Sequence, residues 1–279
     1  MYFTFCQEKK LYQKKKKTSL FFKLSSENSN LNNYIIIIMT EINILQRGNV
    51  YFFYRSKIEK NGVQRFFLVL RPEKQESYHL LIIGKKRLPV KKEKSYFAFL
   101  EAIKESKNDL LQTLGEKHYS TKTRGERTLP FCYCLGEGKY LLLAHGNHTH
   151  FIYQLVHPTQ IKKSQEEFHI QKEDDYLISV KNPQIGVELR GIGLDKRQKV
   201  NYPTNLQEKF SSGYHFVPLN PADFLNYEGA ELLLIPKTKE SLIHTEKGIV
   251  TCLNEIYFDN LLNEFAQTIS PEAIAPIEE

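Results

Sequence analysis

Three histidines, His145, His148 and His150, lie close together in the sequence and are the first residues to suggest chemistry. Imidazole nitrogens are ligands that zinc accepts, and a zinc ion with an open coordination position activates water for hydrolysis. On a strand, His148 and His150 would share one face because side-chain direction repeats every two residues. The pattern leaves two alternatives open. One is a metal-dependent hydrolase that uses all three side chains, and the other is a polar hairpin with solvated or hydrogen-bonded histidines.

A second group, Arg124, Glu126 and Arg127, surrounds a glycine in a loop rich in hydroxyl side chains. Guanidinium groups bind phosphate or carboxylate in a bidentate manner, so this loop is a candidate ligand-binding site together with His148 and His150. The alternative is an internal Arg–Glu network that pins the loop to the protein. The loop lacks the residue order of a P-loop, which disfavours an ordinary nucleoside triphosphatase.

Aromatic and basic residues are interleaved in the first part of the chain. The aromatic residues are Tyr51, Phe53 and Phe66, and the basic residues are Arg55, Lys57, Arg65, Lys85, Lys86 and Arg87. Exposed rings among cations stack bases and contact phosphates, so RNA binding through this sheet face is an alternative function. The commoner arrangement places the rings in the core and leaves the cations as a solvated rim. Nucleic acid is therefore a partner that the sequence permits but does not favour.

The formal net charge of +7 is concentrated near the N-terminus. Residues 1–38 contain seven lysines and two glutamates, whereas the remaining residues carry 32 basic and 30 acidic side chains. A general electrostatic attraction to nucleic acid or membrane therefore fails, although a local patch is still allowed. The restricted alphabet of residues 1–38 predicts a non-native or disordered basic extension before a start at Met39. The alternative is a basic targeting or membrane-surface arm.

The apolar runs and the cysteines bear on the compartment. No apolar run approaches the length of about 20 residues that a membrane span needs. The four cysteines, Cys6, Cys132, Cys134 and Cys252, show no disulfide framework, so we expect a cytoplasmic protein with free thiols at Cys132 and Cys134. No dinucleotide or catalytic motif is present, so no cofactor is expected, and whether the protein is an enzyme stays open.

Apolar patterning predicts a series of short strands and two or three helices. The expected strands cover residues 50–55, 65–70, 78–83, 140–144, 151–156, 176–180 and 231–235. The expected helices cover residues 95–114, with Ser95 as N-cap, and a last one from Asn254, and short helical segments are expected near 204–210 and 221–225. Asn61-Gly62 and Gly146-Asn147 predict hairpin turns, and residues 118–128 are expected to form a polar loop.

This order lacks regular β–α alternation and predicts an α+β protein with a strand-rich, mostly antiparallel sheet or barrel-like core. We expect one domain over residues 39–270, with a sub-domain division near residue 130 as an alternative, and a frayed tail over residues 271–279. Residues 66–70 are apolar on both faces of their strand, which predicts a central or doubly covered strand.

Several phrases of the sequence together resemble a family of uncharacterised bacterial proteins. They are GNVYFFYR from residue 48, GKKRLP from residue 84, TRGER from residue 123, HTH from residue 148, SVKNP from residue 179 and YEGAEL from residue 227. The resemblance covers about residues 47 to 235 and implies no activity, cofactor or active site. The leading hypothesis is a bacterial, non-enzymatic binding or regulatory module with an anionic ligand or a protein as partner.

Overall fold

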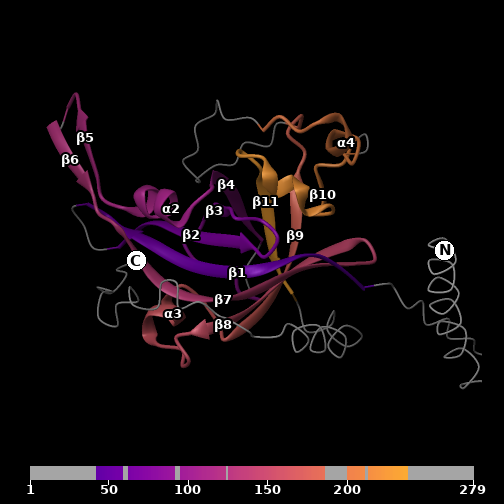
Figure 1. The fold of residues 1–279 in the computed structure, drawn as a ribbon, viewed down its shortest axis with the longest axis horizontal. Helices are drawn as coiled ribbons and strands as arrows, with labels where there is room; N and C mark the ends of the chain where they lie inside the picture. The colour runs from indigo at the N-terminus through magenta and orange to yellow at the C-terminus, as the bar shows by residue number, and fades with distance from the viewer. Residues whose placement is uncertain are drawn as a thin grey trace, which may run out of the picture. The chain divides into compact units, whose positions relative to one another are not determined.

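An antiparallel sheet that closes on itself forms the centre of the structure. The computed structural model describes residues 42–58, 62–91, 95–123, 125–185, 200–210 and 213–237. Eight strands pair in the order β9-β11-β4-β3-β2-β1-β7-β8, and β8 pairs again with β9, so the sheet is a closed barrel (Figure 1). The predicted strand-rich antiparallel core is therefore confirmed.

The barrel strands are β1 (Ile42–Ser56), β2 (Val63–Pro72), β3 (Tyr78–Ile83), β4 (Tyr96–Lys104), β7 (Cys132–His145), β8 (His148–His157), β9 (Glu173–Lys181) and β11 (Glu231–Pro236). The short strand β10 (Phe216–Pro218) extends the sheet beside β9, and β5 (Lys117–Thr121) pairs with β6 (Gly125–Leu129) in a separate two-stranded sheet. The described helices are α2 (Lys107–Leu114), α3 (Lys163–Glu167), α4 (Thr204–Gln207) and the 3-10 helix η1 (Ala222–Asn226). Because these helices are short, the α+β class is supported only loosely.

The two ends of the barrel carry different connections. At one end β1 and β3 finish while β2 and β7 begin, because neighbouring strands are antiparallel. We call this the ribbon end, because the β5–β6 hairpin, a two-stranded ribbon, joins the barrel there through the start of β7 (Figure 1). At the far end, β7 turns into β8 between His145 and His148. The segment that carries α4 and η1 also lies at the far end, where Gly229 donates its N–H to the carbonyl of Leu100.

Strand β2 shows why the sequence closes into a barrel with a second layer. Its residues alternate between two hydrophobic clusters, with Phe66 and Leu68 in the barrel interior and Phe67 and Val69 on the outer face. Both faces are buried, which confirms the prediction of a doubly covered strand. Inside the barrel aromatic rings fill the space, as where Phe52 stacks on Phe66 with ring centroids 6.3 Å apart.

The outer face of β1 to β4 is covered by α2. Ser106 caps this helix by accepting a hydrogen bond from the N–H of Asp109, and Gly115 ends it. Its buried face consists of Leu110 and Leu114, which join the outer cluster. Burying two leucines contributes roughly 3–6 kcal/mol before the loss of chain entropy is subtracted. The helix thereby fixes the position at which the chain leaves for β5.

The predicted helix over residues 95–114 is wrong in its first half. Residues 96–104 form β4, which pairs with β3 on one side and β11 on the other. Tyr96 and Leu100 lie in the interior cluster while Phe99 lies in the outer one. A strand that is apolar on both faces imitates the spacing of a buried helix, and its aromatic content fits the sheet better. The true helix begins after Ser106.

The predicted polar loop over residues 118–128 is also wrong, because these residues form β5 and β6. The predicted strand over residues 78–83 is found with the same bounds as β3, and the other predicted strands are longer. The predicted turn at Gly146 is confirmed, with a positive φ of 59°. The short helices near residues 204 and 221 are confirmed as α4 and η1. The expected helix from Asn254, residues 1–38 and the tail 271–279 lie outside the described residues.

Strands on both sides of residue 130 belong to the same closed sheet, because β1 pairs with β7 along most of its length. None of the helices in the described ranges is long and apolar enough to cross a membrane.

Candidate functional site

The β5–β6 hairpin, called the ribbon below, is held at its base by one buried arginine. Arg55 is only 5% exposed, although it lies near the end of β1 at the ribbon end. Its guanidinium donates hydrogen bonds to the carbonyls of Thr113 (3.1 Å) and Gly115 (3.0 Å), before the ribbon, and of Pro130 (2.5 Å), after it. Five donors in a fixed fork let one guanidinium serve several carbonyls. Arg55 therefore ties both legs of the ribbon to the barrel.

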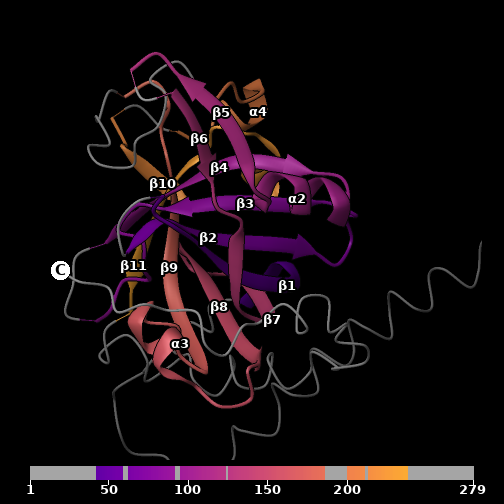
Figure 2. The same cartoon turned by 90° about the vertical axis from the view of Figure 1, so that its left-hand side faces the viewer.

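Beyond its base, the ribbon is exposed on both faces. Most of residues 116–126 that the structure describes are exposed, and Tyr119 keeps 39% of its surface open to solvent. In Figure 1 the ribbon projects away from the barrel past α2, and Figure 2, which views that side, shows it in front of the barrel strands. A two-stranded sheet without a packed face is marginally stable by itself. Its anchoring by Arg55 therefore matters for its shape.

The strand register sorts the charges of the ribbon by face. Lys117, Tyr119 and Arg127 share one side, because Tyr119 stands opposite Arg127 and side chains alternate along a strand. We call this the cationic face. Ser120 and Glu126 stand opposite each other on the other side. The two strand cations therefore lie beside the exposed Tyr119 ring, and the strand carboxylate points away from them.

Two of the predicted ligand-binding residues lie in the ribbon. Glu126 is exposed and Arg127 is half-buried, whereas Arg124 lies outside the described residues. The predicted grouping of Glu126 with the arginines is not supported by the register, which places Glu126 and Arg127 on opposite faces.

A second group of cations lies at the same end of the barrel. Lys57 follows β1, Arg65 lies in β2, and Lys85 and Lys86 follow β3. Lys86 donates a hydrogen bond to the carbonyl of Val63, and its pKa is lowered by burial and by the charges of Lys57 and Arg65. Lys86 therefore stands close enough to Lys57 and Arg65 to be repelled by them. We call Lys57, Arg65, Lys85 and Lys86 the barrel-end cations.

The aromatic residues that were grouped with these cations are core residues. Tyr51 is 1% exposed, Phe53 is 3% exposed and Phe66 is fully buried. These rings therefore have no open face on which a base could stack, and the sheet face expected to bind RNA is covered by α2. The grouped lysines and Arg87 are exposed and Arg65 is half-buried, as the commoner arrangement predicted, whereas Arg55 is buried and departs from it.

The histidines lie at the far end, separated from the ribbon by the length of β7. His145 and His148 face each other across the β7–β8 turn, and the rings of His145 and His150 are 6.2 Å apart. Fourteen residues of β7 span roughly 45 Å at about 3.3 Å per residue. The structure therefore does not bring His148 and His150 together with Arg127 in one surface.

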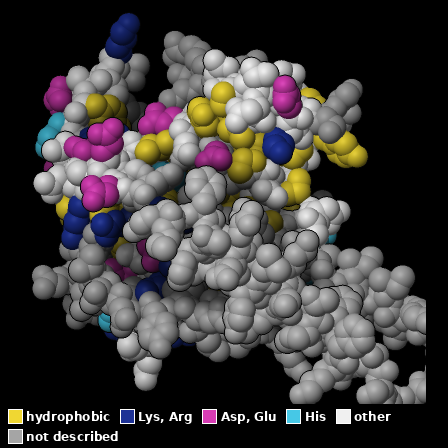
Figure 3. Space-filling model, turned by 45° about the vertical axis from the view of Figure 1, so that its right-hand side comes forward, with side chains coloured by type: hydrophobic (Ala, Val, Ile, Leu, Met, Phe, Trp, Pro, Cys, Tyr) yellow, Lys and Arg dark blue, Asp and Glu magenta, His cyan; other side chains and the backbone are white. Residues whose placement is uncertain are grey.

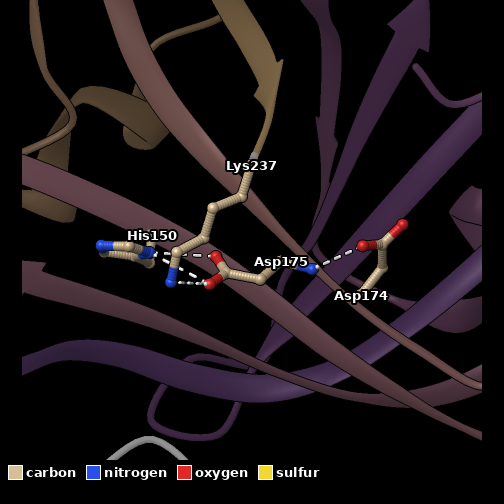
Figure 4. Close-up of polar contacts among 4 residues, drawn as sticks. All are labelled: His150, Asp174, Asp175 and Lys237. Atoms are coloured by element: carbon tan, nitrogen blue, oxygen red, sulfur yellow. Dashed lines mark hydrogen bonds and ion pairs between the residues drawn. The ribbon is translucent and has the colours of Figure 1, made fainter. Parts of the chain in front are cut away.

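His150 is part of a buried polar cluster on the outer side of β8 and β9 (Figure 4). Its Nδ1 lies 3.0 Å from Oδ1 of Asp175, and Nζ of Lys237 donates to Oδ2 of the same carboxylate at 2.9 Å. His150 and Lys237 are 3% and 4% exposed. One carboxylate thus joins β8, β9 and the residue after β11, which is a structural role.

The same geometry does not favour the metal-dependent hydrolase. Asp175 holds His150 through Nδ1, a contact that metal-bound histidines also make, so this contact does not distinguish the two alternatives, and His148 is exposed at the turn. The pKa of His145 is lowered, mainly by burial and also by the neighbouring His150 and His148. Within the described ranges, no group of three or more His, Cys, Asp or Glu side chains is arranged to hold a metal ion.

The outer sides of β9, β10 and β11 present a third feature, an apolar surface (Figure 3). Tyr214 is 62% exposed there, and half-buried Phe216 contacts Phe97 of β4 with ring centroids 6.1 Å apart. Lys181 and Glu231 form an ion pair between β9 and β11. The ion pair ties the neighbouring strands β9 and β11 together, and the ring contact joins β10 to β4 across them.

Cys132 and Cys134 are free thiols that contact the outer cluster, as expected. Burial raises the pKa of the Cys132 thiol to about 12, against the lowering effect of the nearby Arg55 charge. Neither thiol is poised as a nucleophile, because the reactive form is the thiolate.

Comparisons of the chain with protein-family models, with curated proteins and with solved structures found no match. The resemblance to a family of uncharacterised bacterial proteins therefore stays a prediction, and so do the bacterial origin and the cytoplasmic location.

Proposed function

We propose that the protein is a non-enzymatic binding module that contacts an anionic partner through its ribbon end. The binding surface consists of the cationic face of the ribbon and the barrel-end cations. The observation that carries the proposal is the Arg55 anchor. A buried guanidinium is costly to desolvate, and here its hydrogen bonds hold the two legs of an otherwise exposed hairpin.

Charge and shape support this assignment over the histidine hairpin. Cations at the ribbon end come from β5, β6 and three barrel segments, whereas the carboxylate beside His150 is already shared with Lys237. A polar, exposed hairpin on a rigid scaffold is a common place for binding residues. Catalysis is not needed to explain any of these features, and the metal-dependent hydrolase lacks a gathered ligand set within the described residues.

The test is a variant without the ribbon. The carbonyls of Gly115 and Pro130 accept hydrogen bonds from the same nitrogen of Arg55, so the two chain ends are adjacent. Residues 116–129 can therefore be replaced by an Asn-Gly turn. We expect this variant to keep its circular-dichroism spectrum and to lose the partner that co-purifies with the intact protein. Retention of the same partner by the shortened, folded protein would contradict the proposal.

A further inference from the structure

We propose that the anionic partner is a B-form nucleic-acid duplex, with the ribbon in its major groove and the barrel-end cations on the flanking phosphates. This inference rests on the proposed function and assigns its partner. The first support is dimensional. An antiparallel two-stranded ribbon fits the B-form major groove, which is about 12 Å wide, whereas the A-form major groove is too narrow to admit side chains.

The chemistry of the cationic face fits a groove. Lys117 and Arg127 supply donors for phosphates and base edges, and Tyr119 adds a hydroxyl group on the same face. The hydroxyl of Thr121, in contrast, donates to the carbonyl of Gly125. Lys122, at the turn, is exposed as well. Tyr119 is the one exposed ring that the structure describes on the cationic face, since His118 lies on the other face. One ring is too few for a stacking platform, which needs successive aromatic residues. The arrangement therefore favours a duplex over a single strand.

The barrel-end cations supply an independent second support. They lie where β1 and β3 end, which is the end from which the ribbon projects. Crowding of like charges around Lys86 is unfavourable in the free protein. A row of phosphates relieves this repulsion, since DNA carries one negative charge per 1.7 Å of its axis. An acidic peptide also supplies negative charge, but it has no groove for the ribbon to enter.

Salt dependence gives the expected magnitude. Each neutralised phosphate contributes about −0.9 to the slope of log affinity against log salt, so the three ribbon cations that the structure describes, Lys117, Lys122 and Arg127, predict about −2.7. Binding then weakens about 40-fold between 50 and 200 mM salt, and each barrel-end cation that contacts a phosphate steepens the slope by about 0.9. The seven lysines of residues 1–38 add the same background to the full chain and to every variant, so the difference in slope between variants carries the test.

The experiment measures fluorescence anisotropy of a labelled 24-base-pair DNA duplex with the full chain and with three Lys→Gln variants. K117Q changes the cationic face, K85Q changes the barrel-end cations, and K209Q, exposed at the far end, is the matched control. We expect K117Q and K85Q to weaken binding several-fold and to reduce the salt slope by about 0.9 each, while K209Q leaves both unchanged. An A-form RNA duplex of the same sequence should bind at least tenfold more weakly.

Three outcomes would overturn the inference. Equal effects of K117Q and K209Q would show that binding depends only on net charge. Equal affinity for the A-form duplex would show that the ribbon does not enter the major groove. If the protein does not bind DNA but binds a polyglutamate peptide in a way that depends on Lys117, the partner is an acidic polypeptide and not a nucleic acid. That last result would leave the proposed ribbon-dependent function intact, so the two failures are distinguishable.

Discussion

Replacing Arg55 with methionine tests the anchor of the ribbon. Methionine has a similar length and keeps the apolar contacts of the arginine stem, but it donates no hydrogen bond. The carbonyls of Thr113, Gly115 and Pro130 would then lose their shared partner. We expect two effects, a lower free energy of unfolding for the protein and a looser ribbon.

The size of the effect follows from the contacts. Hydrogen bonds from a charged donor contribute about 1.5–3 kcal/mol each, but all three carbonyls are only part-buried, so water replaces some of that loss. Removing a buried charge also relieves a desolvation cost. We therefore expect R55M to lower the free energy of unfolding by about 2–4 kcal/mol.

The control for this variant is R47M on the same strand. Arg47 pairs with Glu73 at the surface, with side chains 45% and 52% exposed. An exposed pair contributes about 0–1 kcal/mol, so R47M should change little. Urea unfolding is followed by circular dichroism, because the chain contains no tryptophan. Hydrogen exchange at residues 117–129 should accelerate in R55M and not in R47M. Equal stability losses in the two variants, or unchanged exchange in R55M, would refute the reasoning.

Three further predictions concern the barrel. D175N should lower the free energy of unfolding by about 3 kcal/mol because it leaves Lys237 buried without its partner. Adding K237M to D175N should restore at least half of this loss. A double variant whose loss equals the sum of the two single losses would contradict the coupling. Burial lowers the pKa of His79 from 6.5 to about 4. The folded protein therefore keeps its full stability while His79 is neutral, above pH 6.5, and loses stability as the pH falls towards 4 and the unfolded chain binds the proton more readily. Between pH 7 and 4, the free energy of unfolding should therefore fall by up to about 3 kcal/mol less in H79Q than in the natural protein. Identical pH profiles of the two proteins would argue against this role of His79. G138A should cost about 3 kcal/mol because its Cβ would lie 2.1 Å from a backbone oxygen of β8, whereas G125A, with nothing within 4 Å, should cost about 1 kcal/mol in the same denaturation assay.

Sequence patterning predicts the barrel strands where a short apolar run is bounded by turn residues. Strand β2 was identified because Phe66 to Leu70 are apolar without interruption and a turn signal, Asn61-Gly62, precedes them. Strand β4 was taken for a helix because apolar side chains on both faces remove the alternation that distinguishes the two. Ser106, rather than Ser95, carries the capping hydrogen bond that marks the real helix start.

The ribbon was missed for the opposite reason, because both of its faces are polar and exposed. Residues with a hydroxyl group, such as Ser120 and Thr121, are common in loops. The sequences of β5 and β6 also lack the apolar alternation that predicts a strand. The role of Arg55 was hidden because its partners are backbone carbonyls, which any residue can supply. The partner of His150, Asp175, was hidden by its position on another strand.

The most direct test of the ribbon end as the binding surface is site-specific photo-crosslinking in living cells. A photoreactive phenylalanine analogue is placed at Tyr119 in the ribbon, at His148 in the histidine hairpin, or at Lys209 at the far end, all of which are exposed. We expect adducts from position 119 that nuclease treatment shortens, and none from positions 148 and 209. Adducts from position 148 with none from position 119 would contradict the account and return the binding site to the histidines.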